Sequence, residues 1–293
     1  MSVNLPMYYT QQFASNIQML LQQKESRLRQ AVMTGSHVGE QASPVEQVGA
    51  IEMQPVTGRF QPMGRVDAPV DRRWVFPSDF DLPQLIDSFD KLKMLLDPSS
   101  VFVQNAVAAA SRKMDSLVIA ALNGTAKTGK KGEVSVALPA AQKIAVNFGA
   151  SANVGLTVAK LREAKRLLMA AEVDLESDQI YCPIGATQHD NLLAEIQITS
   201  TEFNDRPVLV DGKVQRFLGI NFIHSERNEL NGSGQTNVPV FAKSGVYLGI
   251  WNDIKTSISQ RHDLQGEPWQ AYVYLSAGAT RLEEKKTVQI TCA

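Results

Sequence analysis

Residues 97–124, DPSSVFVQNAVAAASRKMDSLVIAALNG, predict the long helix around which the rest of the chain is organised. Asp97 is a good N-cap, and Pro98 suits the first helical position. Asn123 and Gly124 supply a stop. Between these ends, apolar residues recur every three or four positions, at Val103, Val107, Ala110, Met114, Leu117 and Ala121. The stretch therefore predicts a helix over 98–123, and its many alanines allow another backbone to pack closely against it.

The residues that follow this helix, NGTAKTGKKG (123–132), nearly match the phosphate-binding loop G-x-x-x-x-G-K-[ST]. Gly124, Gly129 and Lys130 have the required spacing, but Lys131 stands where a magnesium-binding hydroxyl is needed. A phosphate loop also follows a strand and opens a helix, whereas this segment follows a helix and precedes an alternating, strand-like run over 132–138. The order favours a flexible helix-to-strand connection.

The composition is that of a globular chain without a strong charge of either sign. Hydrophobic residues make up 44% of the sequence, and Lys plus Arg (29) nearly balance Asp plus Glu (30). This balance argues against specific nucleic-acid recognition. No apolar run approaches the roughly 18 residues that span a bilayer, so we expect a soluble protein without a membrane partner. Cys182 and Cys292 lie far apart and fit inert thiols in a reducing compartment.

The N-terminal quarter of the chain contains two kinds of segment. Residues 10–32 predict an amphipathic helix whose apolar stripe is too thin for a core element. Residues 34–80 carry a proline every seven to eleven positions, which excludes a helix or a central strand. Strand-like pieces survive between the prolines, as in AIEMQPVTGRF (50–60) and RRWVF (72–76). These pieces predict an extended arm of two strands.

The second half predicts an α+β arrangement. Thr157 caps a helix whose buried side carries Val158, Leu161, Leu168 and Ala171. A strand over 179–184 and a helix over 185–196 follow. Residues 208–226 form a hairpin that turns at Asp211 and Gly212. Further strands are predicted over 238–243, 246–251, 254–262 and 269–293.

No catalytic constellation emerges from the sequence. The four histidines, His37, His189, His224 and His262, are scattered, and neither an HExxH nor a G-x-S-x-G motif is present. The acidic run over 172–178 lacks the regular ligand spacing of a calcium loop. We therefore expect no catalytic residue, no cofactor and no metal site, and we interpret the chain as a non-enzyme.

Residues 10–80 contain large apolar side chains with no obvious core of their own, which indicates contacts with other copies of the chain. Arg112 and Asp115 lie three residues apart on the long helix and could pair on one face. The residues predicted to contact a neighbouring subunit are Phe60, Arg72, Arg73, Trp74, Phe76, Arg112 and Asp115.

Three stretches carry a resemblance to a known family. These are LIDSFDKLKMLLDPSSVFVQNAVAAASRKMDSLVIAALNGTAKTG (85–129), LSAGATRLEEKKTVQITCA (275–293), and LLAEIQITSTEFND (192–205) with the hairpin over 208–226. The chain resembles the major capsid proteins of tailed double-stranded DNA bacteriophages with the Hong Kong 97-like fold, in a podovirus-like branch. The resemblance implies a virion shell protein that assembles, in the host cytoplasm, into hexamers and pentamers around the double-stranded DNA genome.

The resemblance also implies a division of the α+β chain. Residues 1–44 correspond to an N-terminal arm, and residues 45–80 correspond to an extended β-hairpin loop over an adjacent subunit. Residues 81–154 and 263–293 correspond to a peripheral domain that contains the spine helix. Residues 155–262 correspond to an axial domain.

The chain departs from the family in two ways, which affect the expected scaffolding protein and the expected crosslinks between subunits. No large helical extension precedes the arm, so we expect a separate scaffolding protein. The loop over 46–77 contains no lysine, so we expect no Lys–Asn crosslink between subunits. The implied partners are other copies of the chain, a portal at one vertex, a possible decoration protein and non-specifically contacted DNA. The alternatives are an encapsulin-type nanocompartment shell and a nucleotide-binding enzyme using Gly124 to Lys131.

Overall fold

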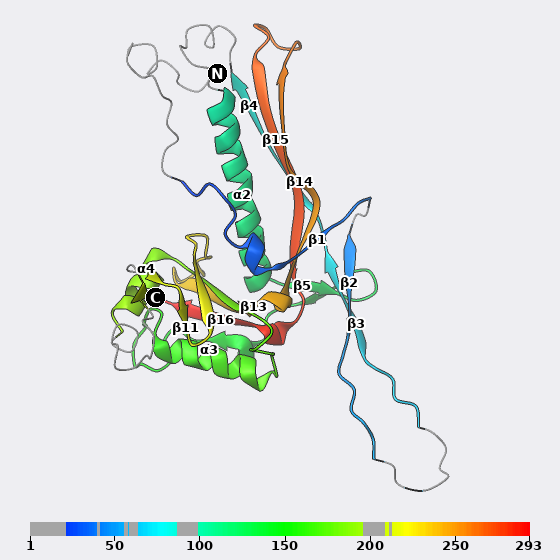
Figure 1. Cartoon of the computed structure of the whole chain (residues 1–293), viewed down its shortest axis with the longest axis vertical. Coiled ribbons are helices and arrows are strands. Elements are labelled where there is room, and N and C mark those ends of the chain that lie inside the picture. Colours follow the sequence, from blue (N-terminus) through cyan, green and yellow to red (C-terminus); the bar gives the residue numbers. More distant parts are fainter. Residues whose placement is uncertain are drawn as a thin grey trace.

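A computed structural model describes residues 22–39, 42–55, 58, 64–86, 99–195, 209–210 and 213–293. The chain forms an α+β molecule with two packed halves and a projecting hairpin (Figure 1). One half contains the long helix and a sheet of long strands, and the other contains a six-stranded sheet with two shorter helices. The hairpin extends away from both halves (Figure 1).

The long helix α2 spans Ser99–Asn123, which confirms the predicted helix and its stop. The predicted N-cap, Asp97 with Pro98, lies outside the described residues. Of the predicted apolar stripe only Met114 is fully buried. The buried side chains are instead Ala106, Ala108, Ser111, Met114, Asp115, Val118, Ile119 and Leu122. The predicted stripe was displaced because alanine and valine occur all around this helix, and packing against β14 and β15 selects the buried face.

The long sheet has the order β1-β14-β15-β4. Its strands are β1 (Met33–Ser36), β14 (Val246–Gln260), β15 (Trp269–Arg281) and β4 (Ser78–Ile86). β1 runs parallel to β14, and the other pairs are antiparallel. Helix α2 packs on one face and forms a core with Leu248, Leu275 and Ala277. β14 and β15 are paired over most of their length, so the expected domain boundary between 262 and 263 falls inside one hairpin.

The six-stranded sheet has the order β11-β12-β8-β13-β16-β7. Its strands are β11 (Arg216–Phe217), β12 (Ile220–His224), β8 (Ile180–Ile184), β13 (Thr236–Ala242), β16 (Thr287–Cys292) and β7 (Lys143–Ile144). Helix α3 (Val158–Ala170) packs on it, with the predicted Val158, Leu161 and Leu168 buried. Thr157 caps α3 by accepting from Lys160 N at 3.4 Å, as predicted. The closing strand β16 belongs to this sheet and not, as expected, with the long helix, because β13 pairs with it along six residues.

The other predicted elements of the second half are present. Helix α4 spans Ala186–Leu193, and β9 (Leu209–Val210) pairs with β10 (Lys213–Val214) around positions 211–212. Short 3-10 helices occupy Arg29–Ala31, Ala140–Gln142, Lys243–Gly245 and Glu284–Lys286. The antiparallel pairing of β9 and β10 confirms the predicted hairpin.

A third sheet joins the hairpin to the end of α2, in the order β2-β3-β5-β6. Its strands are β2 (Ser43–Val48), β3 (Val70–Val75), β5 (Ala126–Thr128) and β6 (Val134–Val136). The antiparallel β2–β3 pair confirms that the arm has two strands, but the first strand is Ser43–Val48 and not the predicted piece over 50–60, whose described residues 50–55 are not in a strand. The prediction of a flexible connection over 123–132 was wrong, since β5 pairs with both β3 and β6. Thr128 Oγ1 reinforces this pairing by donating to Arg72 O at 2.8 Å.

The predicted helix over 10–32 does not extend through the described residues 22–32. This segment is irregular up to the short 3-10 turn at Arg29–Ala31. Leu28 and Val32 are fully buried, although we expected this stripe to be too thin for the core. The carboxylate of Asp115 accepts from the backbone N–H groups of Arg27 and Leu28, both at 3.1 Å, which removes the donors that helical bonds would use. Residues 10–21 lie outside the described residues.

Candidate assembly interface

The β2–β3 hairpin carries a set of exposed apolar side chains. Val48 and Val70 face each other across the pair, and beyond them Gly49 N donates to Pro69 O at 2.7 Å. Val48 is 72% exposed and Met53 is 100% exposed. Val66, Val70 and Ile51 are also exposed. Such a row of exposed apolar groups on a two-stranded projection is typical of a surface that another molecule covers.

The predicted contact residues at the base of the hairpin are held by their own chain. Arg72 Nη2 donates to Glu46 Oε1 at 2.5 Å, and its guanidinium lies 5.8 Å from the ring centroid of Trp74. Trp74 Nε1 donates to Gly129 O at 2.7 Å. Phe76 stacks with Trp74 at 6.5 Å between centroids and stays 44% exposed. Of these three, Phe76 offers the most surface to a neighbour. Phe60, also predicted, lies outside the described residues.

Arg73, another predicted contact residue, is buried in a charged cluster where the hairpin meets α2. Its Nη2 donates to Glu284 Oε2 at 2.8 Å. Arg281 Nη2 lies 3.9 Å from the other oxygen of Glu284. Arg281 is fully buried, and its Nη1 donates to Leu122 O at 2.9 Å and to Gly124 O at 3.0 Å. One carboxylate therefore serves two buried guanidinium groups and ties the hairpin base to the last turn of α2.

Burial is the main influence on the pKa of Arg281. Desolvation lowers this pKa, and the neighbouring Arg73 acts in the same direction, while the charge of Glu284 raises it. The carbonyl groups that Arg281 binds belong to the C-terminal end of α2, where the helix dipole favours a cation. The position of Arg281 thus stabilises both the charge and the helix end.

Arg112 and Asp115 do not form the predicted pair with each other. Asp115 is fully buried, and its oxygens accept from residues 23–28 of the same chain. Arg112 Nη1 donates to Gln22 Oε1 at 2.7 Å and to Gln23 O at 2.9 Å. Burial, and then the charge of Arg227, lower the pKa of Arg112. Both side chains hold the N-terminal segment, because that segment lies across the helix face where a pair would form.

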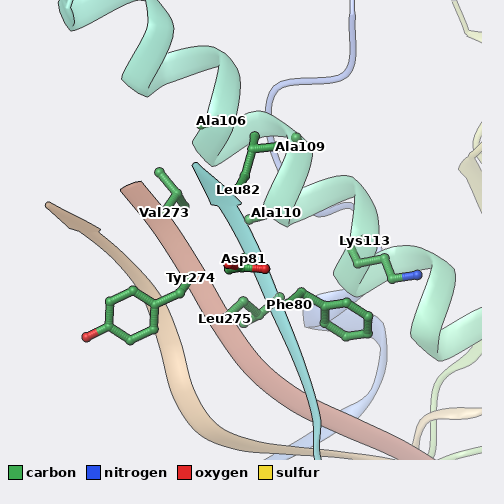
Figure 2. A pocket seen from close by; sticks show the side chains of 10 residues that line it. All are labelled: Phe80, Asp81, Leu82, Ala106, Ala109, Ala110, Lys113, Val273, Tyr274 and Leu275. Atoms are coloured by element: carbon green, nitrogen blue, oxygen red, sulfur yellow. The ribbon is translucent and has the colours of Figure 1, made fainter. Parts of the chain in front are cut away.

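A cavity of about 200 Å³ lies between α2 and the strands β4 and β15 (Figure 2). Its lining is largely apolar, from Phe80, Leu82, Val273, Leu275 and the alanines of α2. Asp81, Lys113 and Tyr274 also line it, and the ammonium of Lys113 lies 4.6 Å from the centroid of the Phe80 ring. Because most of the lining is apolar, the cavity suits an apolar side chain.

The near-match to a phosphate loop has the wrong geometry for nucleotide binding. Gly124 follows α2, and the loop leads through β5 and a turn into β6, so no helix begins at Lys130. Trp74 and Phe76 pack within 3.3 Å of the position that a Cβ at Gly132 would occupy. The backbone N–H groups of this loop therefore face neither a helix dipole nor an open phosphate site. This finding contradicts the nucleotide-binding alternative.

Other candidate chemical groups are used structurally. His189 Nε2 accepts from Val214 N at 3.3 Å, and Cys182 and Cys292 are buried free thiols. Within the described ranges, no group of three or more His, Cys, Asp or Glu could hold a metal ion. None of the helices in the same ranges is long and apolar enough to cross a membrane.

Comparison with protein families gives one match: the model of a family described as "Phage capsid protein" matches residues 5–293. The chain belongs to this family of phage capsid proteins. As the predicted resemblance implied, it is a structural protein of a phage capsid. A comparison with curated protein sequences gives no match.

Solved structures show that this capsid protein has the Hong Kong 97-like fold. The capsid of the cyanophage P-SCSP1u matches with a TM-score of 0.75 at 16% identity, over 97% of this chain and 92% of the other. The capsid of Ralstonia phage GP4 matches with a TM-score of 0.70 at 11% identity, over 97% and 95%. A structure from Mycobacterium phage Che8 matches with a TM-score of 0.68 at 11% identity, over 94% of each chain.

Sequence reasoning missed the residues that anchor the hairpin and the N-terminal segment of the capsid protein. Arg281 and Glu284 fell within the region of predicted strands over 269–293, and Ser26 and Arg27 lay in the helix predicted over 10–32. The one available signal was the position of charged residues beside strongly apolar strands. Such residues are almost never fully buried unless they are paired.

Proposed function

We propose that the capsid protein assembles into hexamers and pentamers in which the β2–β3 hairpin of each subunit lies on an adjacent subunit. The observation that supports this proposal is the hairpin itself, whose apolar residues Val48, Ile51, Met53 and Val70 are exposed on their own chain. Covering side chains of this size stabilises a contact by about 1.5–3 kcal/mol each. A neighbour of the same kind supplies such a cover in every subunit of a closed shell.

Weak contacts suffice for this assembly because each is repeated at every subunit. A head-to-tail contact that closes on itself forms a ring, and rings joined through further contacts form a shell. The hairpin and the N-terminal arm add contacts across neighbours, so that release of one contact leaves the others in place. The near-neutral chain, with a net charge of −1, encloses DNA without binding it tightly.

We also propose the remaining partners from family membership. These are a separate scaffolding protein, a portal at one vertex, a decoration protein on the outer surface and non-specific contacts with packaged DNA. Assembly takes place in the host cytoplasm, and the chain has no enzymatic role. Because residues 46–77 contain no lysine, burial and interlocking arms hold the shell without a Lys–Asn crosslink through this loop.

The test removes the hairpin tip while keeping its base. Val48 and Val70 are directly paired, so a two-residue Asn-Gly turn can replace residues 49–69. We expect this variant to fold, with an unchanged circular dichroism spectrum, and to elute as unassembled subunits or small oligomers. The unaltered protein, expressed with the scaffolding protein of its phage, should give closed shells in negative-stain electron microscopy.

Point variants show whether assembly depends on the exposed apolar side chains or only on the length of the hairpin. Ile51→Ser combined with Met53→Ser should reduce the yield of shells, because both exposed side chains lose their burial energy at the contact. The matched control is Glu52→Gln, which changes an exposed residue between them and keeps both apolar groups. Shells formed at the usual yield by the truncated variant would overturn the proposed role of the hairpin.

A further inference from the structure

Residues 22–28, called here the strap, connect the two halves of the molecule. The first anchor of the strap is Asp115 on α2, a carboxylate that is fully buried. It accepts from Gln23 Nε2 at 2.5 Å and from Ser26 Oγ at 2.6 Å. It also accepts from the backbone N–H groups of Arg27 and Leu28, both at 3.1 Å. Four bonds to one buried carboxylate make this a strong anchor on the long-helix half.

The second anchor of the strap lies on the half that contains the six-stranded sheet. Arg27 Nη1 lies 2.7 Å from His224 O and 2.6 Å from His224 Nδ1, at the end of β12. On its other side His224 Nε2 lies 2.9 Å from Glu226 Oε1. The same Glu226 oxygen accepts from Ala186 N at 2.6 Å, at the start of α4. A continuous line of hydrogen bonds therefore runs from the strap to α4.

The chemistry of Arg27 decides the protonation state of His224 in this arrangement. A guanidinium only donates, so Nδ1 has to be the accepting nitrogen of the ring. The imidazole is then neutral, with its proton on Nε2, where it is donated to Glu226. Protonation of the ring would place an N–H on Nδ1, directly against Arg27 Nη1. Two donors that both carry positive charge would then meet at 2.6 Å, which breaks the contact.

The charged groups around this contact come from three elements. The strap contributes Arg27, the segment after β12 contributes Glu226 and Arg227, and α2 contributes Arg112 and Asp115. Glu226 keeps its bond to a protonated ring, so it holds the imidazolium in place while Arg27 is repelled. Asp115 binds Gln23, Ser26 and backbone N–H groups, so the first anchor does not depend on the state of His224.

We propose that His224 is a pH-sensitive release for the strap, which ties the two halves together when the imidazole is neutral. Histidine as a residue type changes charge between about pH 5 and pH 8, and a charged ring offers Arg27 no acceptor. Arg27 then leaves the six-stranded half, while Asp115 keeps the strap on α2. The two halves lose one brace and become freer to change their relative angle. This device is a property of the single subunit and does not rest on the proposed assembly contacts.

The test is the energetic coupling of Arg27 and His224, measured on the purified, unassembled full-length chain. We expect Arg27→Met to raise the unfolding equilibrium constant about fivefold at pH 8, the usual effect of one such hydrogen bond. At pH 5.5 the same substitution should change it less than about twofold, because the contact is already broken. Urea unfolding followed by tryptophan fluorescence gives both constants.

Two backgrounds make the result specific. In His224→Gln, the amide retains an acceptor and a donor but stays uncharged, so Arg27→Met should have the same effect at both pH values. His262→Gln is the matched control, since His262 Nδ1 lies 3.5 Å from Glu267 and is likewise an exposed histidine beside a glutamate. In that background the effect should still disappear at pH 5.5. An effect of Arg27→Met that is equal at both pH values in the unaltered chain would overturn the proposal. The proposal would also be overturned if the effect of Arg27→Met disappeared at pH 5.5 in the His224→Gln background.

Discussion

Cys182 and Cys292 are buried thiols of the six-stranded sheet, on β8 and β16, the two strands that flank β13. Burial raises the pKa of Cys182 well above its usual value, and the nearby Cys292 adds to this effect. Burial also raises the pKa of Cys292 to about 11, although the charge of Lys160 lowers it. The neutral thiol is favoured in both cases because an apolar core does not solvate a thiolate.

We predict that neither thiol reacts with a disulfide reagent at pH 8 while the protein is folded. At that pH only about one Cys292 side chain in a thousand is ionised. Two thiols per chain should react in denaturant. The raised pKa in the folded state means that stability is retained below about pH 9 and lost as the pH rises towards 11. Reaction should therefore begin in alkaline solution.

The positive control for this labelling is Ser259→Cys, on an exposed position of β14. This cysteine should react at once at pH 8 in the folded protein. Rapid reaction of the native thiols under the same conditions would contradict their burial.

At the scale of elements, the base of the hairpin depends on one carboxylate. Glu284, in the turn between β15 and β16, is the acidic partner of Arg73 on β3 and of Arg281 on β15. Arg281 in turn binds the carbonyl groups at the end of α2. The direction in which the hairpin leaves the molecule is thereby coupled to the helix end and to the turn that leads into the closing strand.

We predict that Glu284→Ala destabilises the fold by about 3 kcal/mol or more, because it leaves buried Arg281 without a counter-charge and leaves Arg73 with only the exposed carboxylate of Asp71, 3.7 Å away. Urea unfolding of the unassembled chain measures the change. The neighbouring Glu283→Ala is the control: Glu283 lies 2.8 Å from Lys286, and both side chains are partly exposed. That substitution should cost about 0.5 kcal/mol or less. Equal losses in the two variants would show that the buried cluster has no special role.

At the scale of the whole molecule, strand β13 belongs to both cores. Val238, Val240 and Ala242 point into the core formed with α3, whereas Phe241 lies in the core formed with α2. Alternate side chains of a strand point to opposite faces of its sheet, so one strand can join two layers. We therefore expect the two halves to unfold together.

We predict that Phe241→Ala destabilises the molecule by about 3–5 kcal/mol, the usual effect of removing a buried ring. Tryptophan fluorescence reports on β3, β14 and β15, which carry Trp74, Trp251 and Trp269, while circular dichroism also reports on α3 and α4. The two signals should change at the same urea concentration, before and after the substitution. Phe148→Ala, at a 37% exposed ring, is the control and should cost far less. Separate transitions for the two probes would contradict a shared core.

The amino-acid sequence by itself determined the local elements and the family. Helical periodicity and a stop at Asn123 predicted α2, and alternation with a turn at 211–212 predicted the β9–β10 pair. Dense prolines between strand-like pieces predicted the two-stranded hairpin. The resemblance of a few stretches, chiefly 85–129 and 275–293, to a known family predicted the capsid fold. These features depend on residues close together in the chain, whose side chains share one face of a helix or strand.

Only the tertiary structure decided which distant segments meet. Asp115 binds residues almost ninety positions away, and Arg73 pairs with Glu284 across 211 positions. The same long-range contacts replaced a predicted helix with the strap, turned the loop over 126–128 into a strand, and placed β16 outside the expected domain. The physical reason is that a local pattern specifies which face of an element is apolar, but not which distant segment packs against that face. Buried charges and unpaired strand edges find their partners only when the chain has packed.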